Sequence, residues 1–82
     1  MTILSPAVVC DAKICHGQPT FHGTRILVAD VLDQVASGLD WAAISEEWNG
    51  AIGSEHIAQA LRMARGNFLE RFEDSEMRRA AS

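Results

Sequence analysis

The residues most capable of chemistry gather near the N-terminus, where both cysteines and two of the three histidines lie between residues 10 and 22. Thiolate and imidazole groups are the usual zinc ligands in proteins. A structural zinc site normally combines two closely spaced ligand pairs, however, and the C-x4-C pair here has no matching second pair. We therefore expect two small apolar thiols and no metal. The four residues concerned are Cys10, Cys15, His16 and His22.

The sequence contains no recognisable catalytic constellation. No serine or cysteine has a histidine base at motif spacing, no glycine-rich phosphate loop is present, and no close pair of carboxylates lies in an apolar setting. Arg25, in the run Gly23-Thr24-Arg25, is able to bind an anion, but a structural ion pair with an aspartate is the favoured interpretation. We predict that the protein is not an enzyme and holds no cofactor.

Composition limits the range of partners. The 82 residues predict one small domain, and an apolar fraction of 48% is enough for a modest core. The formal net charge of −4 argues against a surface that follows phosphates and suits a partner with a basic surface. No apolar run reaches the roughly 20 residues of a membrane span. Because the N-terminus is also unlike a signal peptide, we expect a cytoplasmic protein with no membrane partner.

The elements that position these residues begin with a pair of short β-strands. Residues 1–6 are expected to be frayed, and residues 7–10 are short and β-prone. In the second extended segment, residues 20–27, Phe21 and Ile26 would lie on opposite faces of a regular strand. A bend at Gly23 returns both to one side, because glycine tolerates a positive φ. Gly23, Thr24 and Arg25 are therefore assigned a structural role.

Three amphipathic helices follow. The first has apolar residues at i, i+3, i+4 and i+7 from Val28, and Gly38 is placed to end it. Asp40 is placed to cap the second helix, and Ser54 to cap the third. The apolar stripe of the third helix is long and extends to Phe72.

These elements predict an α+β fold that is mostly α, with a short N-terminal β-strand pair followed by a three-helix, helix-turn-helix-like bundle. Residues 1–72 would form the single domain and residues 73–82 a flexible C-terminal tail. A strand pair is marginal by itself, and the apolar end of the third helix exceeds what three short helices bury. We therefore predict a homodimer. The apolar residues concerned are Phe68, Leu69 and Phe72.

The third helix would be the recognition helix of a helix-turn-helix, with its exposed N-terminal half in the major groove. Glutamine and arginine are good readers of bases, whereas Glu55 would face phosphates unfavourably. The alternative is a helical core with a solvated, mixed-charge face, and the pattern alone favours that alternative. The candidate DNA-binding residues are Ser54, His56, Gln59 and Arg62.

A run of glycine, threonine, arginine and isoleucine at residues 23–26 resembles the domain-of-unknown-function 433 family. The resemblance covers roughly residues 7 to 64. It implies a β-hairpin-like element followed by a helix-turn-helix bundle. It also implies an antitoxin that binds and silences a PIN-like ribonuclease toxin encoded by a neighbouring gene, with repression of the shared operon at operator DNA as an additional role. The other matching positions are Gly17-x-Pro19, Val28, Asp30-Val31-Leu32, Ala36-x-Gly38-Leu39, Ile44, Trp48, Glu55-x-Ile57 and Ala60-Leu61.

The sequence departs from the family pattern in ways that favour protein binding over DNA binding. Leu27 stands where proline is usual, and Gln18 and His22 stand where basic residues are common. The turn at residues 49–53 is also one residue longer than usual. Fewer basic positions mean fewer phosphate contacts, while binding to a protein needs none of them.

An antitoxin of this kind would need no chemistry of its own. It can block the nuclease cleft, or place a cation among the carboxylates that hold the catalytic metal. The rival prediction is a helix-turn-helix transcriptional regulator with no toxin partner, and a third is a plain dimerisation domain. The candidate partner-binding residues are Arg62, Arg65, Arg78 and Arg79.

Overall fold

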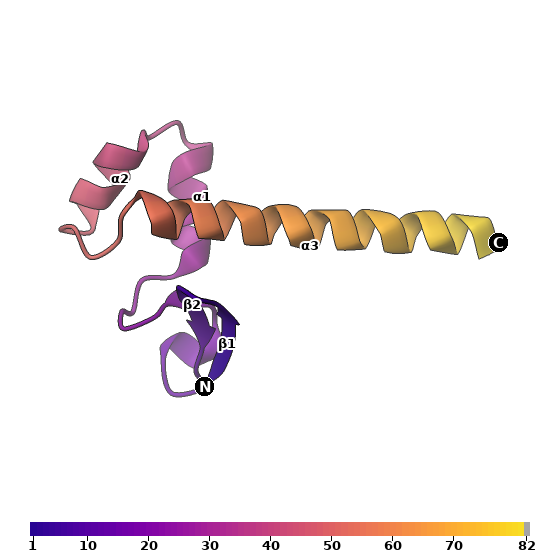
Figure 1. The fold of residues 1–82 in the computed structure, drawn as a ribbon, viewed down its shortest axis with the longest axis horizontal. Coiled ribbons are helices and arrows are strands. Elements are labelled where there is room, and N and C mark those ends of the chain that lie inside the picture. Colours follow the sequence, from indigo (N-terminus) through magenta and orange to yellow (C-terminus); the bar gives the residue numbers. More distant parts are fainter. Residues whose placement is uncertain (82) are drawn as a thin grey trace.

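The computed structural model describes the backbone of residues 1–81 and the side chains of residues 1–73. Three short antiparallel strands are followed by three helices, so the predicted α+β, mostly helical fold is confirmed (Figure 1). The elements are β1 (Thr2–Ser5), β2 (Val8–Cys10), a 3-10 turn η1 (Cys15–Gly17), β3 (Thr20–Phe21), α1 (Val28–Ala36), α2 (Trp41–Glu47) and α3 (Ser54–Ala81).

The sheet has one strand more than the sequence predicts. Its order is β1-β2-β3, with all pairs antiparallel, and β1 occupies residues that were expected to be frayed. Ile3 faces Val9 across the first pair, and Val8 faces Phe21 across the second. The prediction for residues 1–6 is therefore wrong. β1 is largely exposed, so its formation depends on the ladder to β2 and not on a buried face.

The bend at Gly23 is confirmed. Gly23 has φ +79°, in the region that side-chain-bearing residues rarely adopt. Thr24 closes the turn, because its hydroxyl donates to the Phe21 carbonyl at 2.8 Å and accepts from the Ile26 amide at 3.1 Å. The Phe21 amide also donates to the Ile26 carbonyl at 3.1 Å. Phe21 is thereby fully buried, and Ile26 packs against the core from the same side.

The predicted end of α1 and the predicted cap of α2 are both confirmed. Gly38 has φ +90° and follows α1, where the amide of Leu39 donates to the carbonyl of Gln34 and the amide of Gly38 to that of Val35. This pair of bonds is a Schellman motif, which satisfies carbonyls that a helix end leaves free. The carboxylate of Asp40 accepts from the Ala43 amide at 2.8 Å and caps α2.

The start of α3 differs from the prediction. The carbonyl of Gly53 accepts from the amides of His56 and Ile57, so Gly53 is the cap and Ser54 is the first helical residue. His56 returns a bond, because its Nδ1 accepts from the Gly53 amide at 3.0 Å. This reciprocal pair resembles a capping box, with histidine in the usual place of glutamate.

α3 is long and projects from the rest of the molecule (Figure 1). It passes through Gly66 without interruption and continues to Ala81, across the backbone where the sequence predicts a loose tail. The overall dimensions of 50 × 31 × 19 Å reflect this projection. Within the described part of the chain, no helix combines the length and apolar character required to span a membrane.

The core lies where β2, β3 and the three helices meet. Phe21, Ile44 and Ile57 are fully buried there, and each such side chain contributes about 1.5–3 kcal/mol by leaving water. Ile52 is also buried, although the sequence places it in the turn between α2 and α3. The Ser45 hydroxyl donates to the Ile52 carbonyl at 2.8 Å and secures that turn against α2.

Candidate functional site

Of the residues with zinc-ligand chemistry, Cys10 ends β2 and Cys15 begins η1. Cys10 and Cys15 are both free and half-buried. The thiol of Cys15 donates to the Arg25 carbonyl at 3.5 Å. Among the residues that the structure describes, no group of three or more histidine, cysteine or acidic side chains is placed to hold a metal ion.

Arg25 is positioned by the Gly23–Thr24 turn but is itself exposed. No ion pair between Arg25 and a carboxylate is found among the residues with described side chains, and the pairing with an aspartate stays a prediction. Its side chain borders a shallow hollow of about 390 Å³ together with His22 and Thr20. The Thr20 hydroxyl is buried there without a hydrogen-bond partner.

Two of the four candidate DNA-binding residues are engaged inside the fold. His56 caps α3 through Nδ1, and its ring packs edge-on against Phe21 with the ring centroids 5.6 Å apart. Gln59 accepts two hydrogen bonds at Oε1, from the Ser5 hydroxyl at 2.9 Å and from the Ala7 amide at 3.0 Å. Both side chains are half-buried, and both connect α3 to the N-terminal sheet.

The other two candidates are exposed. Ser54 and Arg62 line a shallow hollow of about 360 Å³ on α3, beside Glu55 and Trp41. Trp41 is 39% exposed. This surface offers one cation and one carboxylate to a partner, which is a poor match for a row of phosphates.

Arg62 and Arg65 lie three residues apart on the exposed side of α3, and therefore face the same direction. They are the candidate partner-binding cations whose side chains the structure describes. Arg78 and Arg79 lie outside the residues with described side chains.

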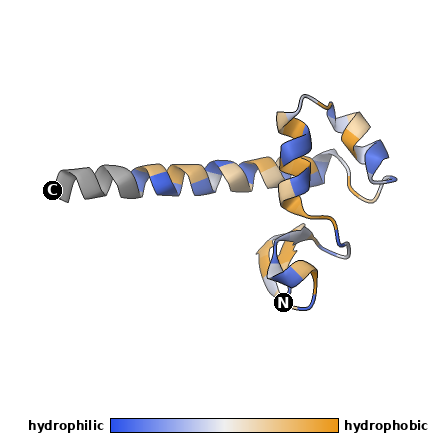
Figure 2. Ribbon diagram, turned by 180° about the vertical axis from the view of Figure 1, so that it is seen from behind, coloured by the Kyte–Doolittle hydropathy of each residue, from blue (hydrophilic) through white to orange (hydrophobic). Residues whose placement is uncertain are grey.

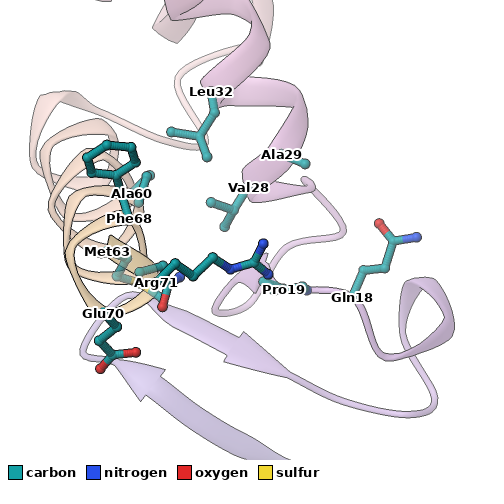
Figure 3. Close-up of a pocket in the computed structure, with 12 residues that line it drawn as sticks. Gln18, Pro19, Val28, Ala29, Leu32, Ala60, Met63, Phe68, Glu70 and Arg71 are labelled. Atoms are coloured by element: carbon teal, nitrogen blue, oxygen red, sulfur yellow. The ribbon is translucent and has the colours of Figure 1, made fainter. Parts of the chain in front are cut away.

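A groove runs between α1 and α3, with a volume of about 710 Å³ (Figure 3). Val28 and Leu32 extend into it from α1, and Met63 and Phe68 border it from α3 (Figure 3). Arg71 reaches from α3 across its opening toward Pro19 (Figure 3). The sequence pattern does not predict the groove, because the groove depends on how α3 crosses α1. Its remaining lining residues are Gln18, Pro19, Ala29, Ala60, Ala64, Asn67 and Glu70.

Charge is distributed unevenly along the chain. Residues 26–61 contain six acidic residues and no lysine or arginine, whereas residues 62–79 contain five basic and four acidic residues. The acidic part includes α1, α2 and the start of α3, and the remainder of α3 is mixed in charge. In a helix-turn-helix the helix before the recognition helix crosses the DNA backbone, and here that helix is α2, with exposed Glu46 and Glu47.

These features define an α+β protein with a helix-turn-helix-like arrangement of α2 and α3. The chain belongs to the family described as "Protein of unknown function (DUF433)", whose model matches residues 8–64. No curated protein and no solved structure matches the sequence significantly. The family match includes Gly23, Gln59 and Arg62 and ends before the exposed aromatic residues of α3.

Proposed function

We propose that this protein is a cytoplasmic antitoxin-like module that binds a PIN-like ribonuclease and inhibits it by occlusion, without catalysing a reaction. The observation that carries the proposal is the position of Arg62 and Arg65, two exposed cations on one side of α3, next to a body whose helices α1 and α2 are acidic. Nucleases that cleave RNA with a divalent metal hold that metal with clustered carboxylates. The resemblance described above supplies the class of partner.

The inhibition would operate at the metal-binding carboxylates of the nuclease. An arginine inserted among these carboxylates would compete with the metal ion for them. Its guanidinium can pair with a carboxylate through two parallel hydrogen bonds. The acidic faces of α1 and α2 would at the same time meet basic residues that a nuclease uses to attract RNA. Excess Mg²⁺ or Mn²⁺ should therefore weaken the inhibition.

The test is co-purification with the product of the adjacent gene, followed by an RNA-cleavage assay. The unaltered protein should stop cleavage, and the double variant Arg62→Glu/Arg65→Glu should fail to do so. Arg25→Glu is the matched control, because Arg25 is also an exposed arginine but lies away from α3. If the two proteins do not associate, or if the nuclease cuts RNA equally well in both mixtures, the antitoxin proposal is wrong.

The second candidate is a helix-turn-helix regulator that binds operator DNA, alone or in addition to the nuclease. It is favoured by the glycine-containing turn between α2 and α3 and by Ser54 and Arg62, which remain accessible at the start of α3. It is disfavoured by the engagement of His56 and Gln59 within the fold. Footprinting of the DNA upstream of the operon, with and without the nuclease, distinguishes the two roles.

A further inference from the structure

The small sheet has two faces, and only one of them packs against the helices. Val8 and Phe21, which pair across β2 and β3, are part of the core. Neighbouring residues of a strand point to opposite faces, so the next pair, Val9 and Thr20, lies on the outer face. β2 is hydrophobic along its whole length (Figure 2). The outer face is nevertheless shielded from water, because Val9 is 3% and Thr20 is 1% exposed.

The hollow of about 390 Å³ described above lies over this outer face. Val9 and Thr20 form its floor, and the half-buried Ile14 adds an apolar wall. The turn after β3 forms its rim, where His22 and Arg25 are exposed. Among the residues with described side chains, no carboxylate lines it. The hollow therefore combines an apolar floor with a cation at its edge.

This hollow also contains hydrogen-bond donors that the fold does not use. The Thr20 hydroxyl is buried and has no partner among the described residues. Buried polar groups are nearly always paired, so an orphaned hydroxyl indicates a missing partner such as a water molecule, an ion or a ligand. Gly23 and Arg25 line the same hollow, and within the described part of the chain neither backbone amide donates a hydrogen bond.

We propose that this hollow binds a small organic carboxylate. Its anionic head pairs with the Arg25 guanidinium and accepts a hydrogen bond from the Thr20 hydroxyl, while its apolar body rests on Val9 and Ile14. A guanidinium matches a carboxylate through two parallel hydrogen bonds. The volume lies at the lower end of the range for small-molecule sites. No residue of α3 lines the hollow, so the proposal does not depend on the nuclease.

Charge favours a carboxylate over a phosphate. Arg25 is the permanent cation among the lining residues, and a carboxylate brings the single negative charge that it can neutralise. A phosphate monoester brings nearly two, to a chain whose net charge is already −4. The carboxylate closest in sequence to the lining residues is Asp11, whose Oδ1 accepts from the Lys13 amide at 2.9 Å. Asp11 would compete with the ligand if it formed the predicted ion pair with Arg25.

A ligand reaches the floor only after a side chain at the rim has moved. The Thr20 hydroxyl has almost no exposed surface in the free chain. Met1 also lines the hollow, and because it is 70% exposed, few contacts hold it in place. Exposed side chains change rotamer within nanoseconds. We therefore expect Met1 to turn away as the carboxylate enters.

The test is a titration of the full chain with benzoate, followed through the amide signals of Thr20, Gly23 and Arg25 in 1H–15N NMR spectra. These signals should shift along a curve that saturates. Benzamide, which has a similar shape but no charge, should leave them in place, and inorganic phosphate should bind more weakly than benzoate.

Four variants locate the site. Arg25→Gln should weaken benzoate binding by roughly tenfold to a hundredfold, and Thr20→Val by about tenfold, as expected for hydrogen bonds to a charged group. Thr20→Ser, which keeps the hydroxyl, should retain most of the affinity. Lys13→Gln is the matched control, because Lys13 is an exposed cation that does not line the hollow.

Several results would overturn the proposal. Shifts that never saturate, or equal shifts with benzamide, would show that no carboxylate site exists. Unchanged affinity in Arg25→Gln would show that the guanidinium is engaged elsewhere, and an equal loss in Lys13→Gln would show attraction to general positive charge. Tighter binding of phosphate would refute the choice of a carboxylate. The NMR spectrum shows whether each variant is folded, and if Thr20→Val is not, the exposed Arg25 still decides the outcome.

Discussion

Replacing Gly23 with valine tests whether the turn before α1 depends on backbone conformation or on space. Gly23 has φ +79°, and a Cβ placed on it meets no atom within 4 Å. A side chain therefore fits, and the whole cost comes from holding an L-residue in the left-handed region. That cost is about 1–2 kcal/mol for an ordinary residue. Valine should lie at the upper end, because its branched Cβ crowds the backbone.

Gly66→Ala is the matched comparison. Gly66 is exposed in the interior of α3, and its Cβ position is also open, so the two sites differ in backbone conformation and not in crowding. Alanine should stabilise the helix by up to about 1 kcal/mol. A third variant, Gly23→Asn, should lose less stability than Gly23→Val, because asparagine tolerates the left-handed region.

Urea unfolding and thermal melting at one protein concentration measure the difference. Gly23→Val and Gly66→Ala should differ by roughly 2–3 kcal/mol in the free energy of unfolding, from the two costs above. In a domain of this size each kcal/mol corresponds to about 4–8 °C in Tm. Equal melting temperatures for the unaltered protein and Gly23→Val would show that the turn does not restrict φ. A destabilised Gly66→Ala would show that α3 is not a continuous helix there.

Three further outcomes are expected. Gln59→Met should cost about 1–2 kcal/mol in urea unfolding, because the Ser5 hydroxyl and the Ala7 amide lose their acceptor, whereas Gln59→Glu should keep most of the stability. Thr20→Val should be neutral or stabilise the fold by up to about 1 kcal/mol, because it removes a buried hydroxyl that has no partner; a clear loss of stability would reveal an unseen bond. DNA binding by the isolated protein, measured by fluorescence anisotropy, should have a log–log salt slope of about −2 per chain, since Arg62 and Arg65 are the exposed cations in the first half of α3. A slope several times steeper would favour the regulator.

The helices and the Gly23 turn could be predicted because their signals are local. Apolar periodicity, the cap at Asp40 and the positive φ of Gly38 each depend on residues within one or two turns. β1 could not be predicted, because its stability comes from pairing with β2 and its own side chains are mostly exposed. Ser54 is a good cap by type, but the reciprocal bonds of Gly53 and His56 begin the helix one residue earlier.

The residue types of the candidate site could be predicted from the sequence, but the contacts and burial of each side chain could not. Arg62 and Arg65 are exposed on α3, as the helical period indicates. Gln59 has the same polar character in the sequence, yet its partners lie 52 and 54 positions away. No local pattern reveals a contact at that separation. The groove depends likewise on how α1 and α3 cross, which the sequence pattern leaves open.

The Gln59 bonds have a consequence for the order in which the chain folds. The hairpin turns and helices join residues that are near one another in sequence, whereas Gln59 joins α3 to residues 52 and 54 positions earlier. Closing that long loop costs more chain entropy than closing the short ones. The strands should therefore dock on α3 after the rate-limiting barrier has been crossed. Loss of the Gln59 bonds would then accelerate unfolding and leave the rate of folding nearly unchanged.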